Sequence, residues 1–152
     1  MNKSLLIKTE YDMRALAVKL AEASFAGGFI ALFGGLGAGK TAFVKGFCAH
    51  FGIEEVSSPT FNIVKHYDGR GAAIDHFDCY RLDDADELIA MGFDEYLFSS
   101  SIILMEWSEN VSDALPAERL EIRIQGSGNE PREVELVPFG QKYEAMIEEL
   151  AL

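Results

Sequence analysis

The stretch that decides the fold is FIALFGGLGAGKT, residues 29–41. Its first five residues form a continuous apolar run, which is typical of a strand covered on both faces in a parallel sheet. The next eight residues, GGLGAGKT, match the phosphate-binding pattern G-x-x-x-x-G-K-[ST] in full. A helix is predicted from Lys40 to about Phe51, so the pattern lies between a strand and a helix, as a phosphate-binding loop must.

The residue types in this loop suit the binding of a polyphosphate. Glycines permit positive φ, so that successive backbone N–H groups converge on phosphate oxygens, and the following helix directs its positive dipole end at the same anion. Lys40 is expected to reach the β- and γ-phosphates, and the Thr41 hydroxyl is expected to bind Mg²⁺. The predicted nucleotide-binding residues of the loop are Gly34, Gly35, Leu36, Gly37, Ala38, Gly39, Lys40 and Thr41.

Working outward from this loop, apolar periodicity predicts strands that alternate with helices. A capping box at Thr9 begins a helix that extends to about Phe25, and Gly92 interrupts a helical region. This alternation predicts an α/β fold, and the length of 152 residues predicts one domain, 1–152. The predicted strands are 4–8, 60–67, 72–78, 102–105, 120–124 and 134–137, and the other predicted helical segments are 83–98 and 143–150.

The chain is strongly acidic, with 13 Lys and Arg against 25 Asp and Glu and a formal net charge of −12. Such a chain repels nucleic acid and anionic membranes at long range. Cys48 and Cys79 belong to no C-x-x-C pattern, so we expect two buried apolar residues in a reducing, cytoplasmic protein. The sequence holds no apolar run long enough for a transmembrane helix.

A phosphate-binding loop also needs an acidic residue to hold the metal's water shell and a group to position the attacking water. Asp78 and Glu106 end apolar strands and are the candidates for these roles. Alternation places His76 on the same face as Asp78, and Asp75 on the other face. We expect Asp75 to be a solvated carboxylate and His76 to be a hydrogen-bonded core histidine.

Several segments, in order along nearly the whole chain, match one family. They are Leu36–Thr41, Ser58-Pro59-Thr60-Phe61, His76–Leu82, Glu106-Trp107, Leu115-Pro116 and Arg132–Leu136. On these segments the chain resembles the bacterial TsaE (YjeE) family, the ATPase of tRNA threonylcarbamoyladenosine biosynthesis. It departs from the family at Gly35, where an acid is common, at Ala42, where a second Thr is common, and at Ser108, where Pro is common.

The resemblance implies a P-loop NTPase domain with a mixed, mostly parallel central sheet flanked by helices, plus antiparallel strands. It implies ATP and Mg²⁺ as cofactors and the TsaB–TsaD complex as protein partner. From the acidic net charge we expect tRNA to be contacted only indirectly and no membrane to be bound. Thr41 and Glu106 resemble Mg²⁺ ligands, and Asp78 resembles a metal-associated or water-orienting residue. Further roles implied by the family are a catalytic Lys40, a γ-phosphate-sensing Thr60, a site-wall or core Trp107, and nucleoside contacts from Arg132, Thr9 and Glu10.

The resemblance thus implies a Mg²⁺-dependent ATPase that is weak alone and stimulated by its partners, and there are three alternatives to it. A small-molecule kinase is disfavoured, because it needs an arginine-rich lid over the phosphates and this chain has only six Arg. A GTPase needs an Asn-Lys-x-Asp signature, which does not occur. A nucleotide-sensing module without turnover is disfavoured by the presence of Thr60, Asp78 and Glu106.

Overall fold

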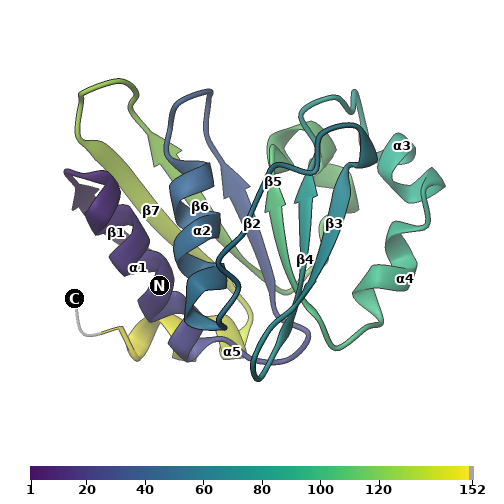
Figure 1. The fold of residues 1–152 in the computed structure, drawn as a ribbon, viewed down its shortest axis with the longest axis horizontal. Coiled ribbons are helices and arrows are strands. Elements are labelled where there is room, and N and C mark those ends of the chain that lie inside the picture. Colours follow the sequence, from purple (N-terminus) through teal and green to yellow (C-terminus); the bar gives the residue numbers. More distant parts are fainter. Residues whose placement is uncertain (151–152) are drawn as a thin grey trace.

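The computed structural model describes residues 1–150, except for the side chain of Thr60. In this part of the chain, seven strands form one mixed sheet in the order β1-β7-β6-β2-β5-β4-β3 (Figure 1). The strands β6, β2, β5 and β4 pair in parallel, whereas β1–β7, β7–β6 and β4–β3 pair antiparallel. The predicted α/β fold with a largely parallel core is confirmed. The strands are β1 (Lys3–Ile7), β2 (Phe29–Phe33), β3 (Val64–Asp68), β4 (Ala73–Asp78), β5 (Ile102–Glu106), β6 (Arg119–Gln125) and β7 (Arg132–Phe139).

Helices cover both faces of the sheet at β2, which explains why that strand is apolar throughout. Ile30 and Leu32 belong to the core cluster that contains residues of α1, α2 and α5. Phe29 and Ala31 belong to the second cluster, with residues of α3, α4 and the 3₁₀ segment η2. The helical elements are α1 (Glu10–Ala23), α2 (Lys40–His50), η1 (Thr60–Asn62), α3 (Ala85–Ala90), α4 (Phe93–Leu97), η2 (Ser108–Ala114) and α5 (Gln141–Glu148).

Helices α1 and α2 lie side by side over the sheet (Figure 1). The Thr9 hydroxyl accepts a hydrogen bond from the Asp12 amide at 3.0 Å, so Thr9 is the N-cap of α1, as predicted. Gly46 allows the close approach of the two helices, because a Cβ atom there would lie 2.7 Å from the Arg14 carbonyl oxygen. Any larger residue at this position would push α2 away from α1 and shift the loop that precedes α2.

The predicted strand over 60–67 is wrong in its first half. Residues 60–62 form η1, and β3 begins only at Val64. The reason lies at Ile63, whose φ of 67° is in the left-handed region and breaks the extended chain. The Ile63 carbonyl accepts a hydrogen bond from the Asp78 amide at 2.8 Å, which fixes this bend against the end of β4.

The expectation that Asp75 is solvated is also wrong. Asp75 is 3% exposed, and its Oδ1 atom lies 2.6 Å from Nδ1 of His66 on the neighbouring edge strand β3. The other ring nitrogen of His66 lies 2.9 Å from Asp68. A buried carboxylate therefore has a partner across the antiparallel pair, as buried charges require.

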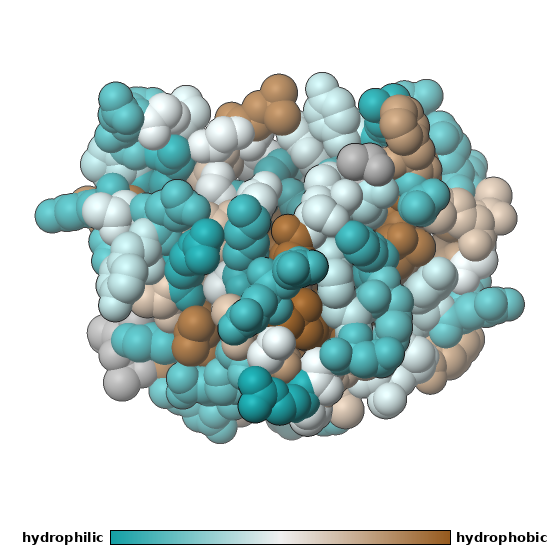
Figure 2. Space-filling view, viewed as in Figure 1, coloured by the Kyte–Doolittle hydropathy of each residue, from teal (hydrophilic) through white to brown (hydrophobic). Residues whose placement is uncertain are grey.

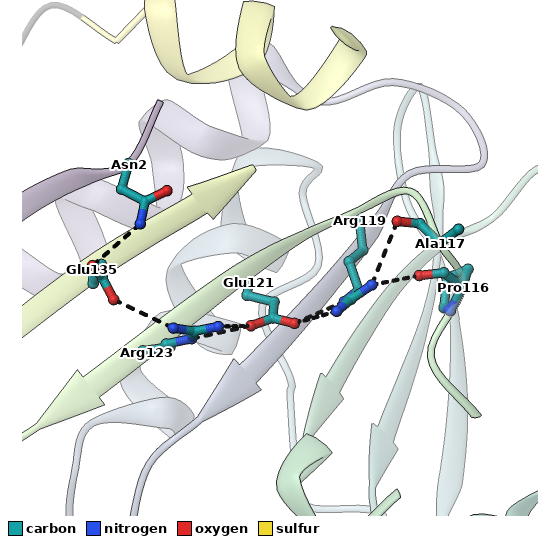
Figure 3. Close-up of polar contacts among 7 residues, drawn as sticks. All are labelled: Asn2, Pro116, Ala117, Arg119, Glu121, Arg123 and Glu135. Carbon is teal, nitrogen blue, oxygen red and sulfur yellow. Dashed lines mark hydrogen bonds and ion pairs between the residues drawn. The ribbon is translucent and has the colours of Figure 1, made fainter. Parts of the chain in front are cut away.

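The face of β6 opposite α1, α2 and α5 carries charges in place of apolar side chains. Glu121 is 4% exposed and lies between the guanidinium groups of Arg119 and Arg123, at 2.7 Å and 2.6 Å (Figure 3). Arg123 also approaches Glu135 on β7, at 3.6 Å. These ion pairs allow charged residues to occupy alternate positions of a central strand, since the Glu121 carboxylate is satisfied on both oxygens.

Most of the visible molecular surface is hydrophilic (Figure 2). The face over α1 and α2 is mostly hydrophilic, with a few separate hydrophobic areas (Figure 2). Within residues 1–150, none of the helices has the length and hydropathy needed to cross a bilayer.

Cys48 and Cys79 are buried, free thiols, as predicted, and burial raises the pKa of each to about 12.

Candidate functional site

A cleft of about 1060 Å³ lies where β2, β4 and β5 end and α2 begins. Ligands of open α/β sheets bind at this edge, outside the carboxyl ends of the strands. Gly34 and Gly35 are not among the lining residues, and the side chain of Thr60 lies outside the described part of the chain. The predicted site residues that line the cleft are Thr9, Glu10, Leu36, Gly37, Ala38, Gly39, Lys40, Thr41, Asp78, Glu106, Trp107 and Arg132.

The loop that precedes α2 has the backbone conformation that its glycines predict. Gly37 and Gly39 have φ values of 76° and 106°, in the left-handed region that residues with a side chain rarely adopt. Gly39 is the N-cap of α2 and offers no side-chain oxygen to the first amides of the helix. These amides and the positive end of the helix dipole are therefore left to an anion in the cleft.

Lys40 lines the cleft although the residue is only 6% exposed. Its Nζ atom donates a 2.5 Å hydrogen bond to the Gly34 carbonyl and lies 3.5 Å from the centroid of the Trp107 ring. Burial lowers the pKa of Lys40 more than the neighbouring carboxylates raise it. Those carboxylates belong, in order of their effect, to Glu109, Glu106 and Asp78.

Trp107 forms a wall of the cleft from an unusual backbone conformation. Its φ and ψ are 58° and 40°, in the left-handed region, which is uncommon for a bulky residue. Its ring makes an edge-to-face contact with the ring of Tyr80, and the two ring centroids are 5.0 Å apart. The turn at Trp107 directs the chain from the end of β5 into η2, where Glu109 accepts a hydrogen bond from the Gly34 amide at 3.1 Å.

Two candidate carboxylates face the loop from neighbouring strands. Asp78 and Glu106 are opposite each other in the parallel β4–β5 pair. Asp78 accepts hydrogen bonds from the Ser58 hydroxyl at 3.1 Å and from the Tyr80 amide at 3.0 Å. Glu106 is 6% exposed, and its Oε2 atom lies 2.6 Å from Nε2 of His76.

Ser58 and His76 line the cleft but were not predicted as site residues. The sequence carried a signal for His76, because its alternation with Asp78 puts both on one face of β4. Ser58 gave a weaker signal, as part of the Ser58–Phe61 segment. Ser58 contacts Asp78 and His76 contacts Glu106. Both contacts join residues that are distant in sequence, and they form only once the fold brings them together.

Arg132 lies in the cleft wall but its guanidinium group holds the loop itself. It donates hydrogen bonds to the carbonyls of Gly37 and Ala38, both at 3.0 Å, and to the Gly128 carbonyl at 3.0 Å. A further short hydrogen bond goes to the carbonyl of Glu130. The β6–β7 connection is thus tied to the tip of the phosphate-binding loop, and the nucleoside contact of Arg132 stays a prediction.

Thr9 and Glu10 line the cleft at the first turn of α1. The Thr9 hydroxyl is already used as an acceptor by the Asp12 amide, whereas Glu10 is exposed and pairs with Arg14 at 3.4 Å. Their role as nucleoside contacts stays a prediction.

The donor set in the cleft suits a magnesium–nucleotide complex better than a metal held by protein alone. Among residues 1–150, no group of three or more His, Cys, Asp or Glu side chains could hold a metal ion. Mg²⁺ is usually bound by one or two carboxylates together with substrate phosphates and waters. Asp78 and Glu106 offer two carboxylates to the cleft, and Thr41 adds a hydroxyl oxygen.

Comparisons with known proteins point to one family. The family model described as "Threonylcarbamoyl adenosine biosynthesis protein TsaE" matches residues 7–134. The tRNA threonylcarbamoyladenosine biosynthesis protein TsaE of Bacillus subtilis is 39% identical over 152 residues, covering 98% of this chain and 95% of that protein. The protein of the same name from Haemophilus influenzae is 40% identical over 107 residues, covering 70% and 67%. The crystal structure of Bacillus subtilis YdiB matches with a TM-score of 0.85 and 32% identity, covering 98% of this chain and 93% of that one.

Proposed function

The chain belongs to the TsaE family and has that family's role in threonylcarbamoyladenosine modification of tRNA, and from this premise we propose that it is a Mg²⁺-dependent ATPase that supports turnover of the TsaB–TsaD complex. One observation carries the proposal: a complete phosphate-binding loop, whose Lys40 lines the cleft, shares that cleft with two carboxylates at the ends of neighbouring strands. Phosphoryl transfer to water needs these parts and little covalent chemistry from the protein.

In this proposal the loop amides and Lys40 hold the β- and γ-phosphates of ATP. The Lys40 ammonium and the first turn of α2 neutralise charge that develops as the terminal phosphoryl group leaves. Glu106 or Asp78 orients the attacking water, and Thr60 senses the γ-phosphate. The bond between the γ-phosphorus and its bridging oxygen breaks, water supplies the new oxygen, and the products are ADP and inorganic phosphate.

Thr41, Glu106 and Asp78 are the residues that would hold Mg²⁺. When bound, the ion would supply Lewis-acid chemistry and neutralise the negative charge of the phosphates. The side chains of Glu106 and Asp78 are held by His76 and Ser58 respectively. This support suits ligands that must keep one orientation, because hydrogen bonds to metal-binding carboxylates fix their geometry.

The partner proposed for the chain is the TsaB–TsaD complex. Two exposed apolar side chains belong to the cleft wall: Leu36, at the tip of the loop, is 72% exposed and Tyr80 is 51% exposed. Exposed apolar groups at a site entrance favour contact with another protein. We propose that docking there completes the site, so that hydrolysis is weak in the isolated chain. With a net charge of −12, the chain is proposed to reach tRNA only through its partners, in the cytoplasm.

Two substitutions test the binding and hydrolysis roles separately. Lys40→Ala is expected to abolish ATP binding in calorimetry, because it removes the cation from the phosphate site. Glu106→Ala is expected to keep ATP binding and lose phosphate release in the presence of TsaB–TsaD. Glu148→Ala, on the exposed side of α5, is the matched control and should change neither property. Unchanged ATP affinity in Lys40→Ala would contradict the proposal.

The same assay distinguishes the alternatives. A small-molecule kinase would consume ATP only when an acceptor is supplied, and the label of γ-³²P-ATP would appear on that acceptor. A nucleotide-sensing module would bind ATP without releasing phosphate, even with TsaB–TsaD present. The ATPase proposal requires labelled inorganic phosphate to appear without any added acceptor.

A further inference from the structure

The buried pair of His76 and Glu106 joins a proposed site carboxylate to a histidine that the sequence alone places in the core. His76 is 2% exposed and Glu106 is 6% exposed, and the 2.6 Å contact between Nε2 and Oε2 joins adjacent parallel strands diagonally. Charged or polar groups are seldom buried so deeply without a use, since a similar apolar pair would avoid the desolvation. Both side chains line the cleft.

The surroundings of the imidazole indicate which nitrogen carries the proton. Among the described residues, Nδ1 of His76 is buried and has no hydrogen-bond partner. If Nδ1 carried a proton, an N–H donor would be buried without an acceptor, and Nε2 would offer no proton to the carboxylate. The hydrogen-bond network therefore assigns the proton to Nε2, which donates to Oε2 of Glu106.

This hydrogen bond occupies only one of the two carboxylate oxygens. Oε2 of Glu106 is held by His76, and the carboxylate group borders the same cleft as Lys40 and Thr41. The carboxylate is thus restrained in rotation by a group that is itself packed in the core. A group that must meet a water or a metal ion at a fixed point gains most from such a restraint.

We infer that His76 is a positioning residue for Glu106: it fixes the orientation of the carboxylate through Oε2, so that Oε1 is presented to the reaction. This inference rests on the proposed ATPase function. His76 acts through Glu106 alone and contributes little to the binding of the nucleotide. It differs from the core-histidine interpretation, which predicts an effect on stability and none on catalysis.

The test compares three replacements of His76. His76→Leu keeps much of the volume and removes the donor, His76→Gln places an amide N–H near the position of Nε2, and His76→Asn has an amide too short to reach it. With TsaB–TsaD present, we expect His76→Leu and His76→Asn to lower kcat by about 10- to 100-fold. The KM for ATP should stay within about twofold of wild type, and His76→Gln should recover most of kcat, since the conservative variant restores the hydrogen bond.

Two further measurements keep the test decisive. In a Glu106→Ala background, His76→Leu should lower the residual rate no further, because a residue that acts through Glu106 has nothing left to position. Independently of activity, the ring ¹⁵N signals of His76 in the protein without nucleotide should show the Nε2–H form. Glu106→Ala should shift the Nε2–H signal.

Each outcome decides the inference. Wild-type kcat in a folded His76→Leu protein, a loss in His76→Gln as large as that in His76→Leu, or an Nδ1–H ring would overturn it while leaving the ATPase proposal intact. If wild-type protein with TsaB–TsaD releases no phosphate, the proposed function is overturned and this inference with it. If His76→Leu does not fold, the comparison of His76→Gln with His76→Asn decides the result.

Discussion

Replacing Arg132 by Met is expected to weaken ATP binding through the shape of the phosphate-binding loop. The guanidinium group donates one hydrogen bond to Gly37 and one to Ala38 in the loop, both at 3.0 Å. Its other two hydrogen bonds go to its own β6–β7 connection. In Arg132→Met the loop loses both hydrogen bonds to β7. Binding of ATP must then order the loop, and the free energy of this ordering weakens the binding.

The magnitude follows from the two hydrogen bonds to the loop. Each contributes about 0.5–1.5 kcal/mol, because Arg132 is only partly buried and water competes for the carbonyls. Their sum of about 1–3 kcal/mol corresponds to a rise of roughly 5- to 150-fold in the Kd for ATP. The fold itself should survive, since Arg132 is the first residue of β7 and lies beside the cleft, outside the hydrophobic core.

Calorimetric titration of ATP with Mg²⁺ into each variant measures this effect. Arg132→Lys keeps the positive charge but not the planar fork, so it should bind only slightly better than Arg132→Met. Arg123→Met is the matched control, because it removes an arginine from the same hairpin on the other face of the sheet. An ATP affinity of Arg132→Met equal to wild type would refute the reasoning. Full recovery in Arg132→Lys would show that charge alone matters.

Three further predictions concern stability and reactivity. At pH 8, Cys48 and Cys79 should resist alkylation in the native protein and react fully in guanidinium, because burial raises the pKa of both thiols to about 12; rapid native labelling by mass spectrometry would contradict this. Glu121→Ala should lower the free energy of unfolding in urea by about 1–3 kcal/mol, since it removes charged hydrogen bonds but leaves two arginines that water can partly solvate; an unchanged midpoint would argue against the burial described. Hydrogen bonds to Asp75 and Asp68 raise the pKa of His66 above 6.5, so its stabilising contribution is complete below pH 6.5 and is lost as the pH rises through the raised pKa; urea unfolding of His66→Gln should lack this part of the pH dependence seen in wild type.

Much of the fold could be predicted because the decisive signals are local. The apolar run 29–33, the glycines of the loop and the Lys40-Thr41 pair specify a strand, a turn and a helix from adjacent residues. Gly92 marked the break between α3 and α4 for the same reason. The resemblance to the TsaE family supplied the mixed sheet, which the periodicity alone leaves open.

The features that could not be predicted depend on contacts between distant segments. The burial of Asp75 requires the register that places His66 opposite it, and the sequence does not fix that register. The hydrogen bonds of Arg132 to the loop join residues 94 and 95 positions apart. The positive φ of Ile63 is held by the end of β4, although a β-branched residue in an apolar segment favours a strand.

The most direct test of the proposed function is the rate of phosphate release from ATP as TsaB–TsaD is titrated into the purified chain with Mg²⁺. The proposal predicts a slow basal rate that rises and saturates with the partner complex. It also predicts that Lys40→Ala shows no rise and that Lys142→Ala, on α5, matches wild type. A rate that stays flat across the titration, or a rise that is the same in Lys40→Ala, would contradict it.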